Sequence, residues 1–236
     1  SWNANRKQPE PPTRDDTVGG TDDDPFRSGH QRSAMGLMDT VRSIFGVSAE
    51  ADATRAADPE DLFGMSTAYI TMGADLGYEN AGKAALCFSS VDSTDFSDTV
   101  DEVESILEAG EDDTGTTFSQ HSDNHGYSWV VLDDTDPEDL LTTIHFAADT
   151  FIEQGYGSRL LAAVFAFDKS GTDHAYWIYS FRRGAYYPFA PTGGHERDNR
   201  LEFKLGSVLD GELDVEGDES YWYPLWPDRP GGYPWE

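Results

Sequence analysis

The sequence predicts an α+β fold, in which helices pack on a mostly antiparallel β-sheet within a single domain. Beyond residue 58, apolar residues recur at helical spacing in some segments and alternate with the two-residue period of strands in others. Turn-forming residues join several neighbouring strand segments directly, as hairpins require. The predicted order is α, β, α, β-β, α, β-β-β, α. Hairpins predominate over the β-α-β units of parallel sheets, so we expect an antiparallel sheet.

Four helices are predicted from capping residues and apolar spacing. They lie at 58–72, 93–109, 136–154 and 196–213. Asp58 and Asp136 each precede a proline and two acidic residues. In this combination the aspartate caps the helix and the acids favour the positive end of its dipole. Gly110 and Gly155 are predicted to end the second and third helices, and Gly206 weakens the helical pattern of the fourth.

Strands are predicted where short apolar or alternating runs lie between turn signals. They lie at 83–90, 115–121, 127–133 and 159–168, and two more form a hairpin within 173–191. The run 159–168 is apolar on both faces, which is typical of a strand at the centre of a sheet.

The hairpin stretch 173–191 contains the densest aromatic cluster in the chain, and its two strands are joined at Arg182-Arg183-Gly184. The two-residue period divides the first strand into two faces: Trp177, Tyr179 and Phe181 on one, and His174, Tyr176, Ile178 and Ser180 on the other. Large side chains on both faces predict that the hairpin is central and covered on each side, or partly at an interface. Pro188 and Pro191 lack the backbone donor that would continue the ladder.

The domain organisation follows from changes in composition. We expect a disordered or non-native extension at 1–34, an amphipathic helix at 35–47, a linker at 48–57, the α+β domain at 58–228 and a tail at 229–236. If the extension is non-native, Met35 is the native start. The aromatic run 221–227 is expected to pack back on the domain.

The short segment 36–46 places apolar side chains at helical spacing and has Gly46 as a stop. These side chains are Leu37, Val41, Ile44 and Phe45. Three roles remain open for this helix: docking on the parent domain, lying on a membrane surface, or binding a partner protein. The segment contains one basic residue, Arg42, and one acidic residue, Asp39, so the helix has no basic face. This weakens the alternative that it lies on a membrane surface.

The chain carries a formal charge of −29, from 45 acidic and 16 basic residues, and it has 29 aspartates against four lysines. Such a surface repels itself strongly at low salt, whereas at about 1 M salt the Debye length falls to roughly 3 Å. The aromatic content of 13% argues against an acidic disordered protein. We therefore predict a halophilic protein, haloarchaeal or similar, and exclude nucleic acid as a partner.

Two further observations favour a cytoplasmic location. No apolar run approaches the roughly 18 residues of a membrane-spanning helix, and no secretory signal is visible. Cys87, the only cysteine, lies in an apolar run and is predicted to be a buried thiol.

Basic residues cluster beside the aromatic hairpin. Five of the 11 basic residues beyond Met35 fall within 23 positions: Arg182, Arg183, Arg197, Arg200 and Lys204. In a chain with few other cations, this cluster suggests a face that binds anions or carboxylates. The candidate partner-binding residues are Arg182, Arg183, Tyr186, Tyr187, Arg197 and Arg200. The alternative is internal pairing with Glu196, Asp198 and Glu202.

Catalysis and metal binding have little support in the sequence. The domain contains five histidines: His121, His125, His145, His174 and His195. His121 and His125 flank a turn with Asp123, but no cysteine pair or helical histidine motif accompanies them. No nucleophile elbow, phosphate-binding loop or dinucleotide fingerprint is present. We predict no catalytic residue, metal or cofactor.

Several short motifs together resemble one family. They are Gly126-Tyr127-Ser128-Trp129, the run from Arg183 to Pro191, Arg197-Asp198-Asn199 and Tyr223-Pro224-Leu225-Trp226, and Met35-Gly36-Leu37 resembles the family's usual start. The resemblance is to the PspA-associated protein PspAB family and covers roughly residues 58–227. It implies an accessory role near PspA-type envelope-stress proteins and HtpX-type membrane metalloproteases, and it brings no catalytic residues.

The residues and the resemblance together predict a non-enzymatic accessory protein of a PspA-type membrane stress response, acting through protein–protein binding. The alternatives are a hydrolase or metal-dependent enzyme using the region of His121 and His125, and a regulator of an HtpX-type protease. The expected partner is a PspA-like protein or an HtpX-type membrane protease. We further hypothesise that the protein associates with the membrane, either peripherally through residues 36–46 or through its partner.

Overall fold

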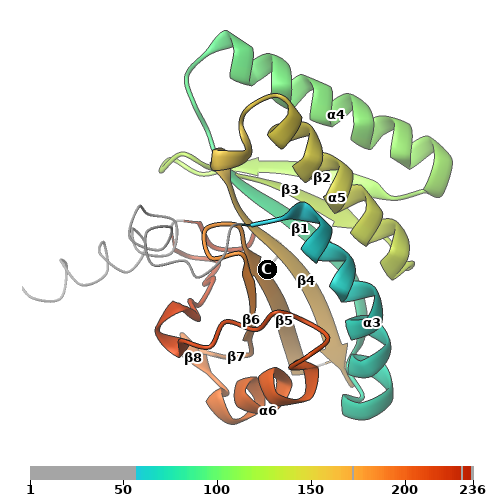
Figure 1. The fold of residues 1–236 in the computed structure, drawn as a ribbon, viewed down its shortest axis with the longest axis vertical. Coiled ribbons are helices and arrows are strands. Elements are labelled where there is room, and N and C mark those ends of the chain that lie inside the picture. The colour runs from blue at the N-terminus through green and yellow to red at the C-terminus, as the bar shows by residue number, and fades with distance from the viewer. Residues whose placement is uncertain (1–56, 172, 230, 235–236) are drawn as a thin grey trace, which may run out of the picture.

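A six-stranded antiparallel sheet forms the centre of the molecule, with strand order β2-β3-β1-β4-β5-β6 (Figure 1). The computed structural model describes residues 57–171, 173–229 and 231–234. The strands are β1 (Glu79–Ser89), β2 (Thr117–Ser122), β3 (Tyr127–Asp133), β4 (Leu160–Lys169), β5 (Asp173–Ser180) and β6 (Ala185–Phe189). The predicted α+β fold with an antiparallel sheet is confirmed. The predictions for 1–34, 35–47 and 48–56 lie outside the described residues.

Helices and a small second sheet complete the described part of the chain. The helices are α3 (Gly64–Thr71), α4 (Thr94–Thr114), α5 (Pro137–Glu153) and α6 (Asn199–Leu209). Shorter helical turns are η1 (Pro59–Phe63), η2 (Met72–Leu76), η3 (Gly157–Arg159) and η4 (Glu219–Tyr221), and the two-stranded sheet pairs β7 (Pro191–Gly193) with β8 (Glu196–Arg197). Figure 1 shows α3, α4 and α5 side by side on one face of the large sheet, with α6 at its β6 end.

Three helix starts are capped locally, two of them at the aspartates that the sequence predicts. The side chains of Asp58 and Asp136 each accept a hydrogen bond from the backbone two residues on, and Ser93 accepts one from the N–H of Phe96. Each cap satisfies a backbone donor that has no partner within the helix. These helix starts therefore depend on residues that are close together in the sequence.

The predicted boundaries of three helices are wrong. The first continues past residue 72 as η2, which ends at Leu76. α4 continues through Gly110 and ends at Gly115, which has a φ of +85° and donates its N–H to the carbonyl of Glu111. The left-handed conformation that stops this helix is thus at Gly115, where glycine adopts it without steric cost. The fourth helix is shorter than 196–213, because residues 196–197 pair in β8 and Asp210 is extended.

Strand β4 lies at the centre of the sheet, as predicted, and its residues from Leu160 to Phe167 are buried. The aromatic hairpin β5–β6, which was expected to be central, instead forms one end of the sheet. The edge of β6 is covered by the later segment 213–216. Tyr186 donates its N–H to the Asp214 carbonyl at 2.8 Å, and Glu216 donates to the Tyr186 carbonyl at 2.8 Å. This pairing hides the edge without a further strand of the sheet.

Both faces of the sheet are buried, in two separate clusters. Alternate residues of β4 divide between them, with Phe165 and Phe167 in the helix-side core and Val164 and Ala166 on the opposite face. The helix-side core is covered by α3, α4 and α5. The C-terminal-side core is covered by Leu225 and by other side chains that follow α6: Trp222, Tyr223, Trp226 and Tyr233. The aromatic run after residue 220 therefore packs back on the domain, as predicted.

None of the helices in the described part of the chain has the length and apolar content needed to span a bilayer.

Candidate functional site

Arg183, a residue of the predicted partner-binding face, lies inside the protein. Only 4% of its surface is exposed, and its Nε donates to the Glu216 carboxylate at 2.7 Å. Its guanidinium also lies 3.7 Å from the ring centroid of Tyr221. A buried guanidinium is tolerated where a carboxylate and an aromatic face replace its water. This arginine thus links the β5–β6 turn to the segment that follows α6.

Arg197 is also engaged within the molecule. Its Nε lies 2.8 Å from both carboxylate oxygens of Glu202, and its Nη1 donates to the Trp222 carbonyl at 2.6 Å. Burial raises the pKa of Glu202, although the hydrogen bonds from Arg197 and from the Ala190 N–H act in the opposite direction. The structure therefore contains the internal pairing between Arg197 and Glu202 that is the alternative to a binding face.

The remaining candidates divide between interior and surface. Tyr186 and Tyr187 are buried on opposite faces of β6, the first in the helix-side core and the second in the C-terminal-side core. Arg182 is half-buried and donates to the Ser158 carbonyl at 2.8 Å, whereas Arg200 is exposed on α6. The six residues do not form one exposed face. A role in partner binding stays a prediction, and only Arg182, Arg197 and Arg200 reach the surface.

The region of His121 and His125 is exposed, at the hairpin between β2 and β3. The Asp123 carboxylate in this turn accepts backbone N–H groups from His125, Tyr127 and Gly231, so it holds the turn and the C-terminal segment together. Within the described ranges no group of three or more His, Cys, Asp or Glu residues is arranged to hold a metal ion. Cys87 is buried as predicted, and burial raises the pKa of its thiol.

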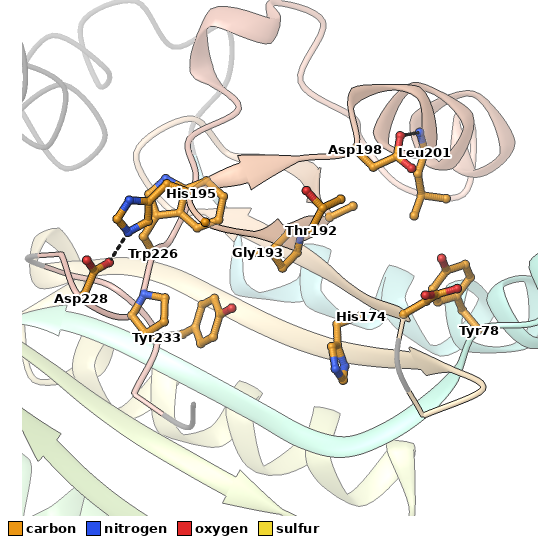
Figure 2. A pocket seen from close by; sticks show the side chains of 15 residues that line it. Tyr78, His174, Thr192, Gly193, His195, Asp198, Leu201, Trp226, Asp228 and Tyr233 are labelled. Atoms are coloured by element: carbon orange, nitrogen blue, oxygen red, sulfur yellow. Dashed lines mark hydrogen bonds and ion pairs between the residues drawn. The ribbon is translucent and has the colours of Figure 1, made fainter.

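A cleft of about 820 Å³ lies between the start of β5, the β7–β8 segment and the chain that follows α6 (Figure 2). It collects residues from distant segments: Tyr78, Asp173, His174, residues 190–195, Asp198, Leu201, residues 226–228 and Tyr233. Figure 2 shows His195, Trp226 and Asp228 at one end, Tyr78 and Asp198 at the other, and Tyr233 and His174 between them. Only the folded chain brings these residues together.

Two histidines of the cleft are each paired with an aspartate. His195 Nε2 lies 2.6 Å from Asp228 Oδ1, and His174 Nδ1 lies 2.5 Å from Asp168 Oδ1. The hydrogen bond with His195 holds the pKa of Asp228 below its usual value. His195 has a φ of +60°, in a tight turn that places its ring 5.3 Å from that of Trp226. This left-handed conformation is uncommon for a residue other than glycine and is compatible with a functional role.

Tyr78 lies at the opposite end of the cleft and precedes β1. Its side chain is almost fully buried, and the Lys169 ammonium lies 5.4 Å from its ring centroid while donating to the Leu76 carbonyl. Burial raises the pKa of Tyr78, and the charges of Asp173 and Asp198 raise it further. The hydroxyl is therefore neutral at ordinary pH and lies in a negative field.

The chemistry of the cleft follows from its lining. The described lining residues include three aspartates and two histidines, with no lysine, arginine, serine or cysteine. Histidine–aspartate pairs are able to bind and move protons, but here no thiol or serine hydroxyl stands beside them to act as a nucleophile. The sequence does not indicate that His174 and His195 share a cleft, because no spacing in the chain places them close together.

A second surface feature lies on the helix layer. Phe63 in η1, Ile70 in α3 and Phe146 in α5 are exposed by 39%, 71% and 53%. The rings of Phe63 and Phe146 both contact the ring of His145, with centroids 4.5 and 6.0 Å away. Ile70 follows Phe63 by seven residues, about two helical turns, so both project from the same side of the chain. We call Phe63, Ile70 and Phe146 the helix-layer patch.

Comparison with known proteins identifies one family. The family model described as PspAB, PspA associated protein B, matches residues 35–235. Neither a curated protein nor a solved structure matches the chain.

Proposed function

Because the chain belongs to the PspAB family of PspA associated proteins, we propose that it is a non-enzymatic accessory protein of a PspA-type envelope stress response. It acts by binding another protein. The family's description indicates association with PspA, which is consistent with an accessory role. The binding surface and the cellular role are our own inference.

The helix-layer patch carries this proposal. Large apolar side chains are normally buried, and a group of them exposed together is typical of a site where another protein binds. Of the five large apolar side chains exposed in the described chain, all but Phe203 lie on η1, α3 and α5, which cover the same sheet face; they are the three residues of the patch and Ile152. Phenylalanine is enriched at protein interfaces, and helical elements present such side chains to a partner helix at regular spacing.

The first partner to test is a PspA-type protein, and the second is an HtpX-type membrane metalloprotease. We propose that binding takes place in the cytoplasm and that the chain reaches the membrane through its partner or through residues 36–46. Because the chain carries a charge of −29, the measured affinity should depend on the salt concentration of the assay. At about 1 M salt long-range attraction is screened, so binding there must come from close apolar and hydrogen-bonded contacts.

The test replaces Phe63 and Phe146 together by serine and measures binding of a purified PspA-type protein by calorimetry at about 1 M salt. We expect affinity to fall about thirtyfold, the factor that corresponds to a loss of 2 kcal/mol at an interface hot spot. The matched control is Phe203→Ser on α6, because Phe203 is exposed by 47% but lies on another helix away from the patch.

Equal losses in the double variant and in Phe203→Ser would contradict a role for the patch. Full binding by the double variant would show that the partner binds at another surface of the protein. In that case Arg200→Glu and Arg182→Glu test the exposed arginines in the same assay. If the wild-type chain binds only the HtpX-type protease, the partner is the protease and the PspA-type protein is excluded.

A further inference from the structure

We propose that residues 36–46 of the same chain dock on the helix-layer patch and cover it until a partner displaces them. Only the competition with a partner rests on the function proposed for the patch, since the docking itself needs no partner. Residues 36–46 lie outside the described part of the chain. Three properties favour them as the occupant: the uncharged elements that carry the patch, the apolar stripe of the segment and the short chain between the two.

The elements that carry the patch contain long stretches without charge, in a chain of which 26% of the residues are charged. Residues 62–74, which include all of α3, contain no Asp, Glu, Lys or Arg, and neither do residues 140–148 of α5. Thr67, between Phe63 and Ile70 at helical spacing, is exposed as well. A surface helix normally has charged residues on its outer face, and a helix without them is typically covered there too. The outer side of α3 is therefore a surface that another segment is expected to cover.

The segment 36–46 has a surface that matches this one. Its one acidic and one basic residue cancel, so it carries no net charge. A helix of these 11 residues is about 16 Å long, and the seven-residue step from Phe63 to Ile70 rises only about 10 Å. The segment is therefore long enough to lie along the patch. Its large apolar side chains recur at helical spacing and form one stripe: Leu37, Val41, Ile44 and Phe45.

The chain between the segment and the patch is short and leads to a fixed point. The Asp58 N–H donates to the Tyr179 hydroxyl at 3.1 Å, which holds the chain against β5, and Phe63 follows five residues later. The 12 residues from Gly46 to Asp58 reach roughly 40 Å when extended and about 20 Å on average. The patch thus lies within reach of the segment without any rearrangement of the described domain.

This tether favours the chain's own segment over a second copy of the protein. A short linker gives a tethered segment an effective concentration on the order of millimolar at its site. A second copy has no such advantage, and its approach is opposed by the repulsion between two charges of −29. The occupant that the charge and the connection favour is therefore residues 36–46 of the same molecule.

Docking of this kind regulates the patch. A partner binds only those molecules in which the patch is uncovered, so its apparent affinity falls in proportion to their fraction. Coverage in about nine of ten molecules lowers the apparent affinity about tenfold. Partner binding in turn releases residues 36–46, the segment through which we propose that the chain contacts the membrane.

The test of docking changes one residue of the stripe in the full chain. Val41→Asp places a charge in the stripe and should release the segment. Ser43→Asp adds the same charge two residues on, about 200° around a helix, and is the matched control. The readout is NMR of the isoleucine methyl groups at constant salt. The Ile70 signal should move in Val41→Asp and stay in place in Ser43→Asp, and the signal of Ile178, in the opposite core, should stay in place in both.

The test of competition is calorimetry with a purified PspA-type protein at about 1 M salt. Val41→Asp should bind about tenfold more tightly than the wild-type chain, because the patch is uncovered in every molecule, and Ser43→Asp should bind as the wild type does. Weaker binding by Val41→Asp would show that the partner binds residues 36–46 themselves, and it would overturn the competition.

The two measurements separate this inference from the proposed function. An Ile70 signal that stays in place in Val41→Asp, or that moves equally in both variants, would overturn the docking, whatever the partner does. An Ile70 signal that depends on the concentration of the wild-type protein would identify a second copy as the occupant and would also overturn it. A signal that moves only in Val41→Asp, with unchanged affinity for the partner, would confirm the docking and refute the patch as the partner's binding surface.

Discussion

The two faces of the sheet are covered differently, one by helices and the other by an irregular segment. On the helix side, β1 and β4 present large side chains to α3, α4 and α5: Leu86, Phe88, Phe165 and Phe167. On the opposite face the same strands present mostly small ones: Ala85, Cys87, Ala162, Val164 and Ala166. The exceptions are Leu161 on this face and the small residues Ala84 and Ala163 on the helix side. The cover on that face is irregular chain that follows α6.

This difference matches the kind of segment that covers each face. A helix is about 10–12 Å across with its side chains, so the space between helix and sheet is filled by large residues from both layers. On the opposite face, the small residues of β1 and β4 leave room for the aromatic rings of the irregular segment: Trp222, Tyr223, Trp226 and Tyr233. The start and the buried face of each helix follow from its own caps and apolar spacing. The C-terminal cover, by contrast, is positioned by contacts with residues distant in the sequence.

The same substitution on each face should show this difference most strongly. Trp177 on β5 belongs to the helix-side core, and Trp129 on β3 belongs to the opposite core. Trp177→Ala should lower the free energy of unfolding by about 4 kcal/mol, since three packed helices cannot collapse into the space left. Trp129→Ala should cost about 3 kcal/mol, because the irregular cover can move inward. Urea unfolding at constant salt measures both. Equal costs would show that the two covers are equally rigid.

Arg183 tests whether the C-terminal cover depends on a buried ion pair. Arg183→Ala leaves the Glu216 carboxylate buried without its partner and should lower the free energy of unfolding by about 3 kcal/mol. Arg200→Ala is the matched control, and as a surface change it should stay within about 0.5 kcal/mol. Thermal unfolding of both variants at one salt concentration is the measurement. A stable Arg183→Ala protein would show that the ion pair is dispensable for the C-terminal cover.

The smallest of these effects concerns the last described part of the cover. Tyr233 is buried against Tyr176, with ring centroids 4.9 Å apart. Tyr233→Ala should cost about 2 kcal/mol, in the range for one buried large side chain. Hydrogen exchange should also speed up in residues 222–229 and remain unchanged in α5, because the cover opens locally. If exchange rises equally in both regions, the two faces unfold as one unit.

The candidate site shows where prediction from sequence is limited. The sequence shows that Arg183 and Arg197 belong to a cluster of basic residues. A cluster of this kind is expected both for buried ion pairs and for an exposed binding face, so the sequence does not distinguish them. Their partners decide between the two. Glu202 is five residues from Arg197, within the local sequence, whereas Glu216 is 33 residues from Arg183 and is brought to it only by the fold.

The sequence alone determined the order of elements, three of the helix starts, the two faces of β5 and the central place of β4. Caps such as Asp58, Ser93 and Asp136 act within three residues, and strand faces follow from alternation, so both are local properties. Tertiary structure alone decided that the aromatic hairpin lies at the end of the sheet, that Arg183 is interior, and that Tyr78, Asp173 and Asp198 share a cleft. Each of these depends on contacts between segments far apart in the chain, which form only when folding closes the loops between them.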